Sequence, residues 1–115
     1  MQQSLAHFPK KVQQQLLFIE KEYNSREDSW NIPREEGIFL NLLIKIQKPK
    51  LILEVGTSYG YSTLFLAEAA VAVNAKIITI DINPTKTNIA KENIEKAGLL
   101  EFVEFITNDA NTALK

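Results

Sequence analysis

The stretch Leu53–Thr63, with the sequence LEVGTSYGYST, decides the fold of this chain. It begins in an apolar segment of strand length, and a strand is predicted over Lys50–Val55. Gly56 can adopt a backbone conformation closed to other residues, and its missing side chain lets a ligand approach the main chain. Gly60 is expected to let the following helix pack close to the strand. The free N–H groups in the first turn of that helix would form a site for an anion or a carboxylate.

On either side of this turn the sequence alternates between helical and extended patterns. Apolar residues at helical spacing predict a helix over Pro9–Tyr23, and Pro33 marks the start of a second helix that continues through Ile46. Further elements are predicted as a helix over Ser62–Val73, a strand over Lys76–Ile82, a helix from Pro84 to Ala97, a strand over Glu101–Thr107 and one more helix beginning in NDANTALK at the C-terminus. Strands that are apolar on both faces belong in parallel sheets covered by helices.

This order of elements predicts an α/β fold. We expect a Rossmann-like doubly wound parallel sheet that is incomplete in this chain, with its first three strands preceded by N-terminal helices. Residues 1–48 are predicted to form the helical segment, and residues 49–115 the N-terminal half of the Rossmann-like domain.

The composition excludes several classes of protein. The chain has 115 residues and a formal net charge of −1, so no strong field favours nucleic acid or an anionic membrane. No apolar run reaches the roughly 20 residues of a membrane span. The absence of cysteine excludes disulfides, thiol nucleophiles and thiolate metal sites. We therefore expect a cytoplasmic protein that binds neither nucleic acid nor a membrane.

An acidic residue follows the glycine turn at the spacing of a nucleoside site. In open α/β sheets ligands bind at the carboxyl ends of the strands, and an acid about 20 residues beyond the glycine motif holds the ribose. Asp81 lies 21 residues after Gly60, at the end of the second predicted strand. The turn lacks the close glycine pair of G-x-G-x-x-G, which argues against NAD. Two alternatives stay open: a non-catalytic nucleotide-binding or dimerisation module, and half of an NAD-dependent oxidoreductase.

The segment Glu54–Ser62, of the form E-x-G-x-x-x-G-Y-S, resembles motif I of class I methyltransferases that use S-adenosylmethionine (SAM). More narrowly, the chain is similar to the caffeoyl-CoA/catechol type of O-methyltransferase family from about Ile32 to Leu114. IPREEGIFLNLL, which contains Gly37, resembles the helix before motif I. ITIDINPTKTNIAKENIEKAGL and FITNDANTAL resemble the second and third motifs, although Asn108 stands where that family often has glycine.

The resemblance implies cofactor-binding roles for the residues that match these motifs. Glu54 and Gly56 would shape the pocket near the methionine part of SAM, and Ser58 and Ser62 would hydrogen-bond the amino acid end, with Ser62 facing its carboxylate. Gly60 also belongs to the cofactor-binding turn, and the segment around Asn31 and Ile32 would close over the cofactor. Around the nucleoside, Asp81 would accept hydrogen bonds from the ribose, Ile82 would pack on adenine, and Asp109 and Ala110 would meet the adenine edge. From the residues alone, Asp109 suits the cap of the last helix equally well.

The resemblance covers only the cofactor half of such an enzyme. In that family the sheet has seven strands in the order 3-2-1-4-5-7-6, and the metal-binding acids and the catalytic base come from the fourth strand onward. No segment here matches D-x-x-x-K-x-x-Y, so we expect no catalytic residue and no metal ligand in this chain. The expectation is a truncated O-methyltransferase that uses SAM, with a small acceptor such as a phenol and, in the intact enzyme, a divalent metal such as Mg²⁺.

The first strand has a further consequence for assembly. It would be central in a complete sheet, but in this chain its outer edge has no partner. Bare apolar edges pair with other chains. We therefore expect a homodimer, or an exchange of elements between two copies, that covers Leu51–Val55.

Overall fold

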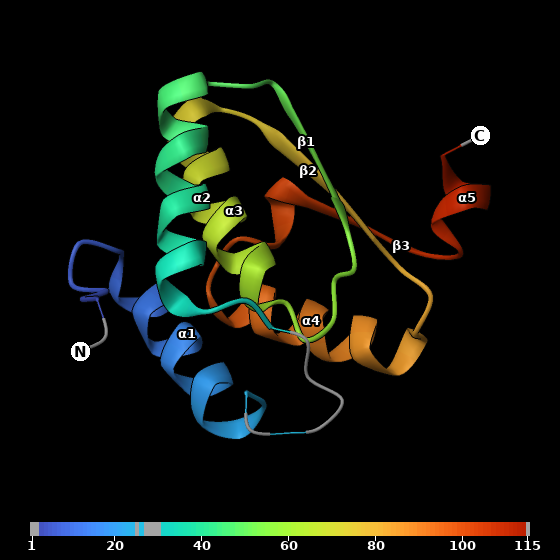
Figure 1. Ribbon diagram of the computed structural model, residues 1–115, viewed down its shortest axis with the longest axis horizontal. Coiled ribbons are helices and arrows are strands. Elements are labelled where there is room, and N and C mark those ends of the chain that lie inside the picture. The colour runs from blue at the N-terminus through green and yellow to red at the C-terminus, as the bar shows by residue number, and fades with distance from the viewer. Residues whose placement is uncertain (1–2, 25, 27–30, 115) are drawn as a thin grey trace.

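The computed structural model describes residues 3–24, 26 and 31–114, and of Ala110 it describes the backbone alone. The elements follow one another as α1 (Lys10–Glu22), α2 (Arg34–Gln47), β1 (Leu51–Val55), α3 (Tyr61–Val73), β2 (Lys76–Asp81), α4 (Pro84–Lys96), a 3₁₀ turn (Leu100–Phe102), β3 (Val103–Thr107) and α5 (Ala110–Ala113) (Figure 1). Every predicted helix and strand is present. The third strand starts later than predicted, because its first residues form the 3₁₀ turn.

The three strands are parallel and lie in the order β1-β2-β3. Val55 is aligned with Ile80, and Asp81 with Thr107, so the carboxyl ends of the strands meet at one edge of the sheet. Helices α3 and α4 pack against the sheet, α2 packs on α3, and α1 packs on α3 and α4 (Figure 1). The prediction of an α/β fold with a three-stranded parallel sheet is therefore confirmed.

The hydrophobic core is one cluster to which the helices and the sheet both contribute. It contains Leu16 and Ile19 of α1, Phe65 of α3 and Ile77 of β2, all at most 1% exposed. α2 packs against α3 at Gly37, where a Cβ atom would lie 2.3 Å from Cδ2 of Phe65. Residues 1–48 and residues 49–115 both contribute to this one core. The division of the chain at residue 48 therefore stays a prediction.

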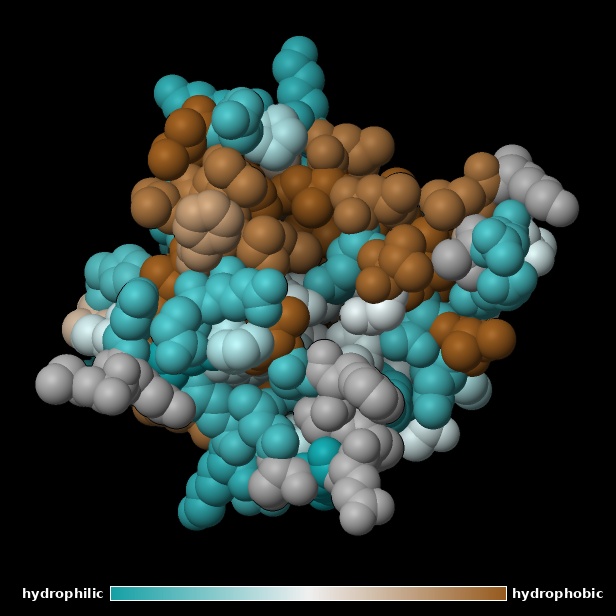
Figure 2. Space-filling view, viewed as in Figure 1, coloured by the Kyte–Doolittle hydropathy of each residue, from teal (hydrophilic) through white to brown (hydrophobic). Residues whose placement is uncertain are grey.

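A large apolar surface extends over α2 and β1. We call it the α2–β1 apolar surface; its members are exposed to between 39% and 64%, and they are Phe39, Leu42, Leu43, Ile46, Leu51, Leu53 and Val55. Figure 2 shows hydrophobic residues gathered over these two elements. β1 has no partner on its outer side among the described residues, as predicted. Within the part of the chain that the structure describes, no helix combines the length and the apolar character of a membrane span.

Candidate ligand-binding site

The glycine turn between β1 and α3 leaves its backbone open at Gly56. This residue has a φ of +94°, and apart from Gly56 itself and its two chain neighbours no atom lies within 4 Å of the place where its Cβ would be. Its N–H donates to the carbonyl of Ile80 over 2.7 Å, which ties the turn to β2. The prediction that a ligand can approach the main chain at Gly56 therefore has the geometry it requires.

Gly60 makes a different close contact from the one predicted. A Cβ atom at this position would lie 3.2 Å from Cβ of Ala90 in α4, so the small residue lets the turn pack on α4 rather than on the strand. The backbone carbonyl of Tyr59 accepts a hydrogen bond from Nδ2 of Asn93, also in α4, over 2.8 Å. Helix α4 thus packs against the turn and donates a hydrogen bond to its backbone.

The carboxylate of Glu54 is surrounded by hydroxyl groups. Its Oε2 accepts from Ser62 over 2.5 Å, and its Oε1 accepts from Thr63 over 2.5 Å and from Thr79 over 2.7 Å. Burial raises the pKa of this carboxyl, and the charge of Asp81 raises it further, although the three hydroxyl bonds act in the opposite direction. Because the Ser62 hydroxyl donates to Glu54, it is free to accept a hydrogen bond, and it must leave Glu54 before it can donate to a ligand.

Asp81 connects the glycine turn to the start of α4. Its Oδ2 accepts from the N–H of Ser58 over 2.8 Å, and its Oδ1 accepts from the N–H of Asn83 over 2.9 Å. Its backbone carbonyl accepts from the N–H of Asn108, at the end of β3. Each carboxylate oxygen keeps lone-pair capacity for a further donor, as the predicted role toward a ribose requires.

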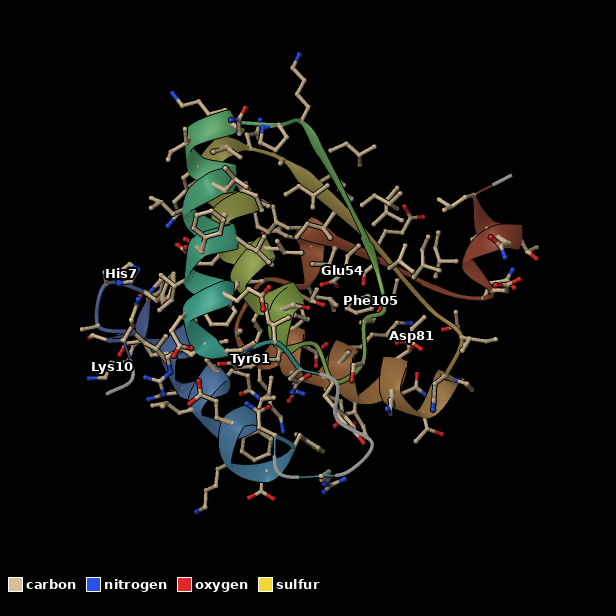
Figure 3. The ribbon with its side chains drawn as sticks, in the orientation of Figure 1. His7, Lys10, Glu54, Tyr61, Asp81 and Phe105 are labelled. Carbon is tan, nitrogen blue, oxygen red and sulfur yellow. The ribbon has the colours of Figure 1, made fainter. Side chains whose placement is uncertain are left out.

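Two hollows meet at the carboxyl ends of the strands, where Figure 3 shows Glu54 and Asp81 on neighbouring strands. The Asp81 hollow, of about 260 Å³, is lined by Val55, Gly56, Ile80, Asp81, Ile82, Asn108 and Asp109. The Glu54 hollow, of about 480 Å³, is lined by Ile32, Leu40, Leu43, Ile44, Ile52, Leu53, Glu54, Val55, Gly56, Ser62 and Leu66. Val55 and Gly56 belong to both, so a single extended ligand can occupy the two hollows across Gly56.

The predicted residues divide between the two hollows. Seven of them line one or both hollows, namely Ile32, Glu54, Gly56, Ser62, Asp81, Ile82 and Asp109. Ser58 and Gly60 line neither. Oγ of Ser58 is buried and has no hydrogen-bond partner within the described structure, while Asn31 donates to Oδ1 of Asn24 over 2.5 Å. Ala110 begins α5, and its side chain lies outside the description.

Asp109 combines the two roles that the sequence left open. Its Oδ1 lies 3.4 Å from the N–H of Asn111, a long capping contact, and the residue also lines the Asp81 hollow. Within the described ranges, no group of three or more histidine and acidic residues could hold a metal ion.

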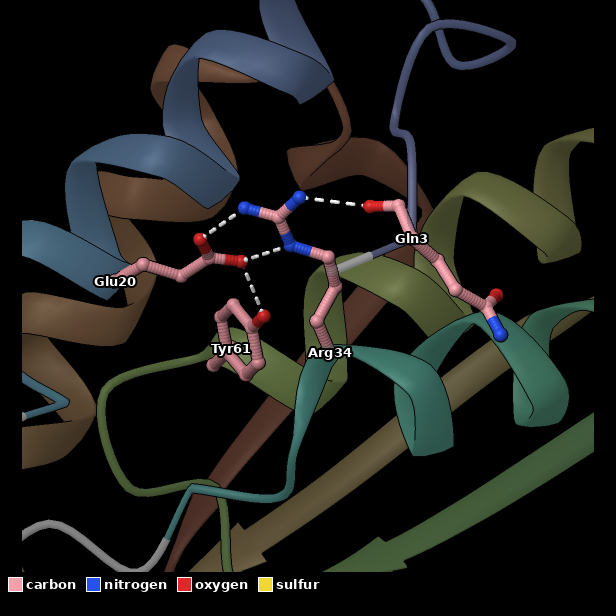
Figure 4. A network of polar contacts seen from close by, with 4 residues as sticks. All are labelled: Gln3, Glu20, Arg34 and Tyr61. Carbon is pink, nitrogen blue, oxygen red and sulfur yellow. Dashed lines mark hydrogen bonds and ion pairs between the residues drawn. The ribbon is translucent and has the colours of Figure 1, made fainter. Parts of the chain in front are cut away.

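The sequence patterns did not identify the polar side chains that line neither hollow but connect the helices around the site. Glu20, Arg34 and Tyr61 join three helices (Figure 4). Gln15 donates to Oδ1 of Asn93 over 2.7 Å, and so links α1 to the contact beneath the turn. These pairs are 14 to 78 residues apart in the chain, and no local pattern signals such contacts.

Comparisons with known proteins agree with this geometry. The sequence profile of a family described as O-methyltransferase matches residues 9–115. The chain is 38% identical over 80 residues to a catechol O-methyltransferase of Niastella koreensis, which is 70% of this chain and 36% of that protein. It is 42% identical over 79 residues to caffeoyl-CoA O-methyltransferase 2 of Petunia hybrida, which is 66% of this chain and 32% of that protein.

A solved structure shares the fold. The O-methyltransferase of Bacillus cereus, determined in complex with S-adenosylhomocysteine (SAH), superposes with a TM-score of 0.77 at 31% identity. The match covers 96% of this chain and 48% of that one. The chain therefore spans about a third of the length of the curated relatives it matches, and about half of this solved structure.

Proposed function

The chain belongs to the O-methyltransferase family, and from that premise we propose that it binds SAM and supplies the cofactor half of a SAM-dependent O-methyltransferase. The observation that carries the proposal is the pair of hollows that share Val55 and Gly56, with open space where a side chain on Gly56 would lie. SAM is an extended molecule with a nucleoside at one end and an amino acid at the other. Family membership also sets aside the NAD-dependent alternative.

The nucleoside end is proposed to lie in the Asp81 hollow. Asp81 would accept hydrogen bonds from the two ribose hydroxyls, and Ile82, which is 72% exposed, would cover one face of adenine. Asp109 and Ala110 would meet the adenine edge. The hydrogen bonds that Asp81 already accepts from two backbone N–H groups hold its carboxylate in place before a ligand arrives.

The amino acid end is proposed to lie in the Glu54 hollow. Glu54 and Ser62 would contact its charged groups, and Ile32 would close over it. Ser58 lines neither hollow, so its proposed contact requires its buried Oγ to turn toward the ligand. When bound, SAM supplies a methyl group on a positively charged sulfur. The residues of this chain that line the two hollows would fix the orientation of that methyl group and exclude water from one side of it.

The finer parts of the proposal concern a complete enzyme of this family. We propose that the acceptor is a hydroxyl of a small molecule such as a phenol, that a divalent metal assists it through residues absent here, and that the protein is cytoplasmic. The relatives named as catechol and caffeoyl-CoA O-methyltransferases support the choice of acceptor. A non-catalytic dimerisation module remains a second candidate, because the α2–β1 apolar surface is available for a partner.

The test is calorimetric titration of the chain with SAH. We expect saturable binding, and Asp81→Ala is expected to weaken it about tenfold or more, since each hydrogen bond to a charged group contributes roughly 1.5–3 kcal/mol. Asp81→Asn keeps an acceptor and is the matched variant, with a smaller expected loss. Binding of NADH in preference to SAH, or no binding of SAH by the folded chain, would refute the proposal.

A further inference from the structure

Three helices meet at one ion pair behind the Glu54 hollow. Arg34, the first residue of α2, donates through Nε and Nη2 to the two carboxylate oxygens of Glu20 in α1, over 2.9 and 2.5 Å. Tyr61, the first residue of α3, donates its hydroxyl to Oε2 of Glu20 over 2.5 Å. Nη1 of Arg34 also donates to the backbone carbonyl of Gln3 over 2.7 Å (Figure 4). One carboxylate thus connects α1 to the starts of both α2 and α3.

Both partners of Glu20 lie next to a wall of the Glu54 hollow. Ile32, which lines the hollow, comes two residues before Arg34. Ser62, which lines the hollow and donates to Glu54, directly follows Tyr61. A shift of Arg34 or Tyr61 therefore moves one wall relative to the other, because each is separated from its wall by at most one residue.

The ion pair is largely enclosed. The side chains of Arg34 and Glu20 are 12% and 15% exposed, and Tyr61 is fully buried. Burial raises the pKa of Glu20, but the bonds from Arg34 and Tyr61 outweigh it and leave that pKa lowered, so the carboxylate is ionised. Burial and the neighbouring Glu20 raise the pKa of Tyr61, so its phenol remains a donor.

A buried ion pair of this kind fixes the relative position of the groups it joins more than it stabilises the fold. Removing two charges from water costs as much as their attraction returns, so a buried ion pair is weak evidence for stabilisation. A bidentate arginine–carboxylate contact, in contrast, fixes both distance and orientation. The Glu20 contact is bidentate and is completed by a third donor from another helix.

We propose that Glu20 is a positioning residue for the amino acid end of the ligand. Through Arg34 and Tyr61 it holds Ile32 and Ser62 at the separation that the methionine part of SAM requires. The inference rests on the proposed function, and it deepens it: a residue of α1 that lines neither hollow determines how tightly the amino acid end binds.

The test compares two ligands that share the nucleoside and the sulfur. SAH carries the amino acid end, whereas 5′-methylthioadenosine has a methyl group in its place. For Glu20→Gln we expect the Kd of SAH to rise about tenfold, and that of 5′-methylthioadenosine to change less than about twofold. Tyr61→Phe, which removes only the hydroxyl, is expected to change the ratio of the two Kd values in the same direction by a smaller factor.

The matched control is another carboxylate between α2 and α3. Glu68 pairs with Lys45 over 2.7 Å and accepts from Asn41 over 2.9 Å. It lies about two helical turns beyond Tyr61 in α3 and lines neither hollow. Glu68→Gln is expected to leave the ratio of the two Kd values unchanged. If Glu20→Gln raises the Kd values of both ligands by the same factor, the inference is overturned and Glu20 has a structural role.

The two levels of the argument remain distinguishable. If the folded wild-type chain binds neither compound, the proposed function fails and the inference fails with it. If it binds both and the ratio of the two Kd values is insensitive to Glu20→Gln and to Tyr61→Phe, only the inference fails. Should Glu20→Gln not fold, Tyr61→Phe carries the same comparison, because an unchanged ratio in that variant alone contradicts the inference.

Discussion

The Glu54 carboxylate accepts hydrogen bonds from three hydroxyl groups, and these bonds have a direction. Thr79 donates to Glu54, so its hydroxyl accepts from Thr57, whose Oγ1 lies 2.6 Å away. The hydrogen bonds therefore run in one direction, from Thr57 to Thr79 and from Thr79 to the Glu54 carboxylate. This arrangement joins the turn, β1, β2 and the first turn of α3 at the point where the two hollows meet.

The enclosure of Glu54 makes the stability of the chain dependent on pH. Burial raises the pKa of Glu54 above its ordinary value of 4.5. Folding then binds a proton, so the corresponding stability is complete below the unfolded-state pKa and is lost as the pH rises through the folded-state pKa. Glu54→Gln has no such proton to lose. We expect its free energy of unfolding, measured by urea titration between about pH 4 and about pH 8, to improve relative to wild type as the pH rises.

A control separates this effect from the removal of one negative charge. Glu92 is exposed on α4, and Glu92→Gln makes the same chemical change without an enclosed site. A stability difference between Glu54→Gln and wild type that does not vary with pH would contradict the prediction.

Among the secondary-structure elements, α4 both covers the sheet and supports the glycine turn. Asn93 is 2% exposed; its Oδ1 accepts from Gln15 of α1, and its Nδ2 donates to the carbonyl of Tyr59. A single amide therefore connects two helices to the turn. The close contact between Gly60 and Ala90 lies one helical turn away on the same face of α4.

Removing this amide is expected to destabilise the fold. Asn93→Ala leaves the buried Gln15 without its acceptor and deletes the bond to the turn, at a cost of about 2–3 kcal/mol in the free energy of unfolding. Asn88→Ala, at an exposed position of the same helix, is the matched control and is expected to change stability by less than about 0.5 kcal/mol. Equal effects of the two substitutions in urea titration would show that Asn93 has no special role.

The order of the elements could be predicted from the sequence, because apolar runs, prolines and glycines mark them locally. Glu54, Gly56, Ser62 and Asp81 could be named in advance for the same reason: they lie in a short motif or at a fixed distance from it. The role of Asn93 could not be predicted in this way. It lies in the charged segment KENIEK, which predicts a solvent-exposed helix face, although the side chain of Asn93 is buried. The bonds of Glu20 to Arg34 and Tyr61, across 14 and 41 residues, depend on how the helices pack.

For the whole molecule, the unusual property is how much apolar surface remains uncovered. The members of the α2–β1 apolar surface are all at least 39% exposed, and the outer edge of β1 offers unpaired backbone groups beside them. Soluble monomers rarely expose a contiguous apolar patch of more than a few hundred Å². The exposed face adjoins the Glu54 hollow, which Leu43, Leu53 and Val55 also line, so whatever covers it lies beside the proposed ligand.

We predict that the 115-residue chain covers this surface with a second copy of itself. Two β1 edges that pair would satisfy backbone groups and bury Leu51, Leu53 and Val55 together. Light scattering coupled to gel filtration should give the mass of a dimer, and Leu53→Lys should shift it to the monomer, because a charge on an edge strand opposes pairing. Leu17→Lys replaces a residue of α1 that is equally exposed, at 50%, away from this surface, and should leave the dimer intact. A wild-type chain that elutes as a monodisperse monomer contradicts the prediction, and it would mean that β1 remains available for strands of a longer protein.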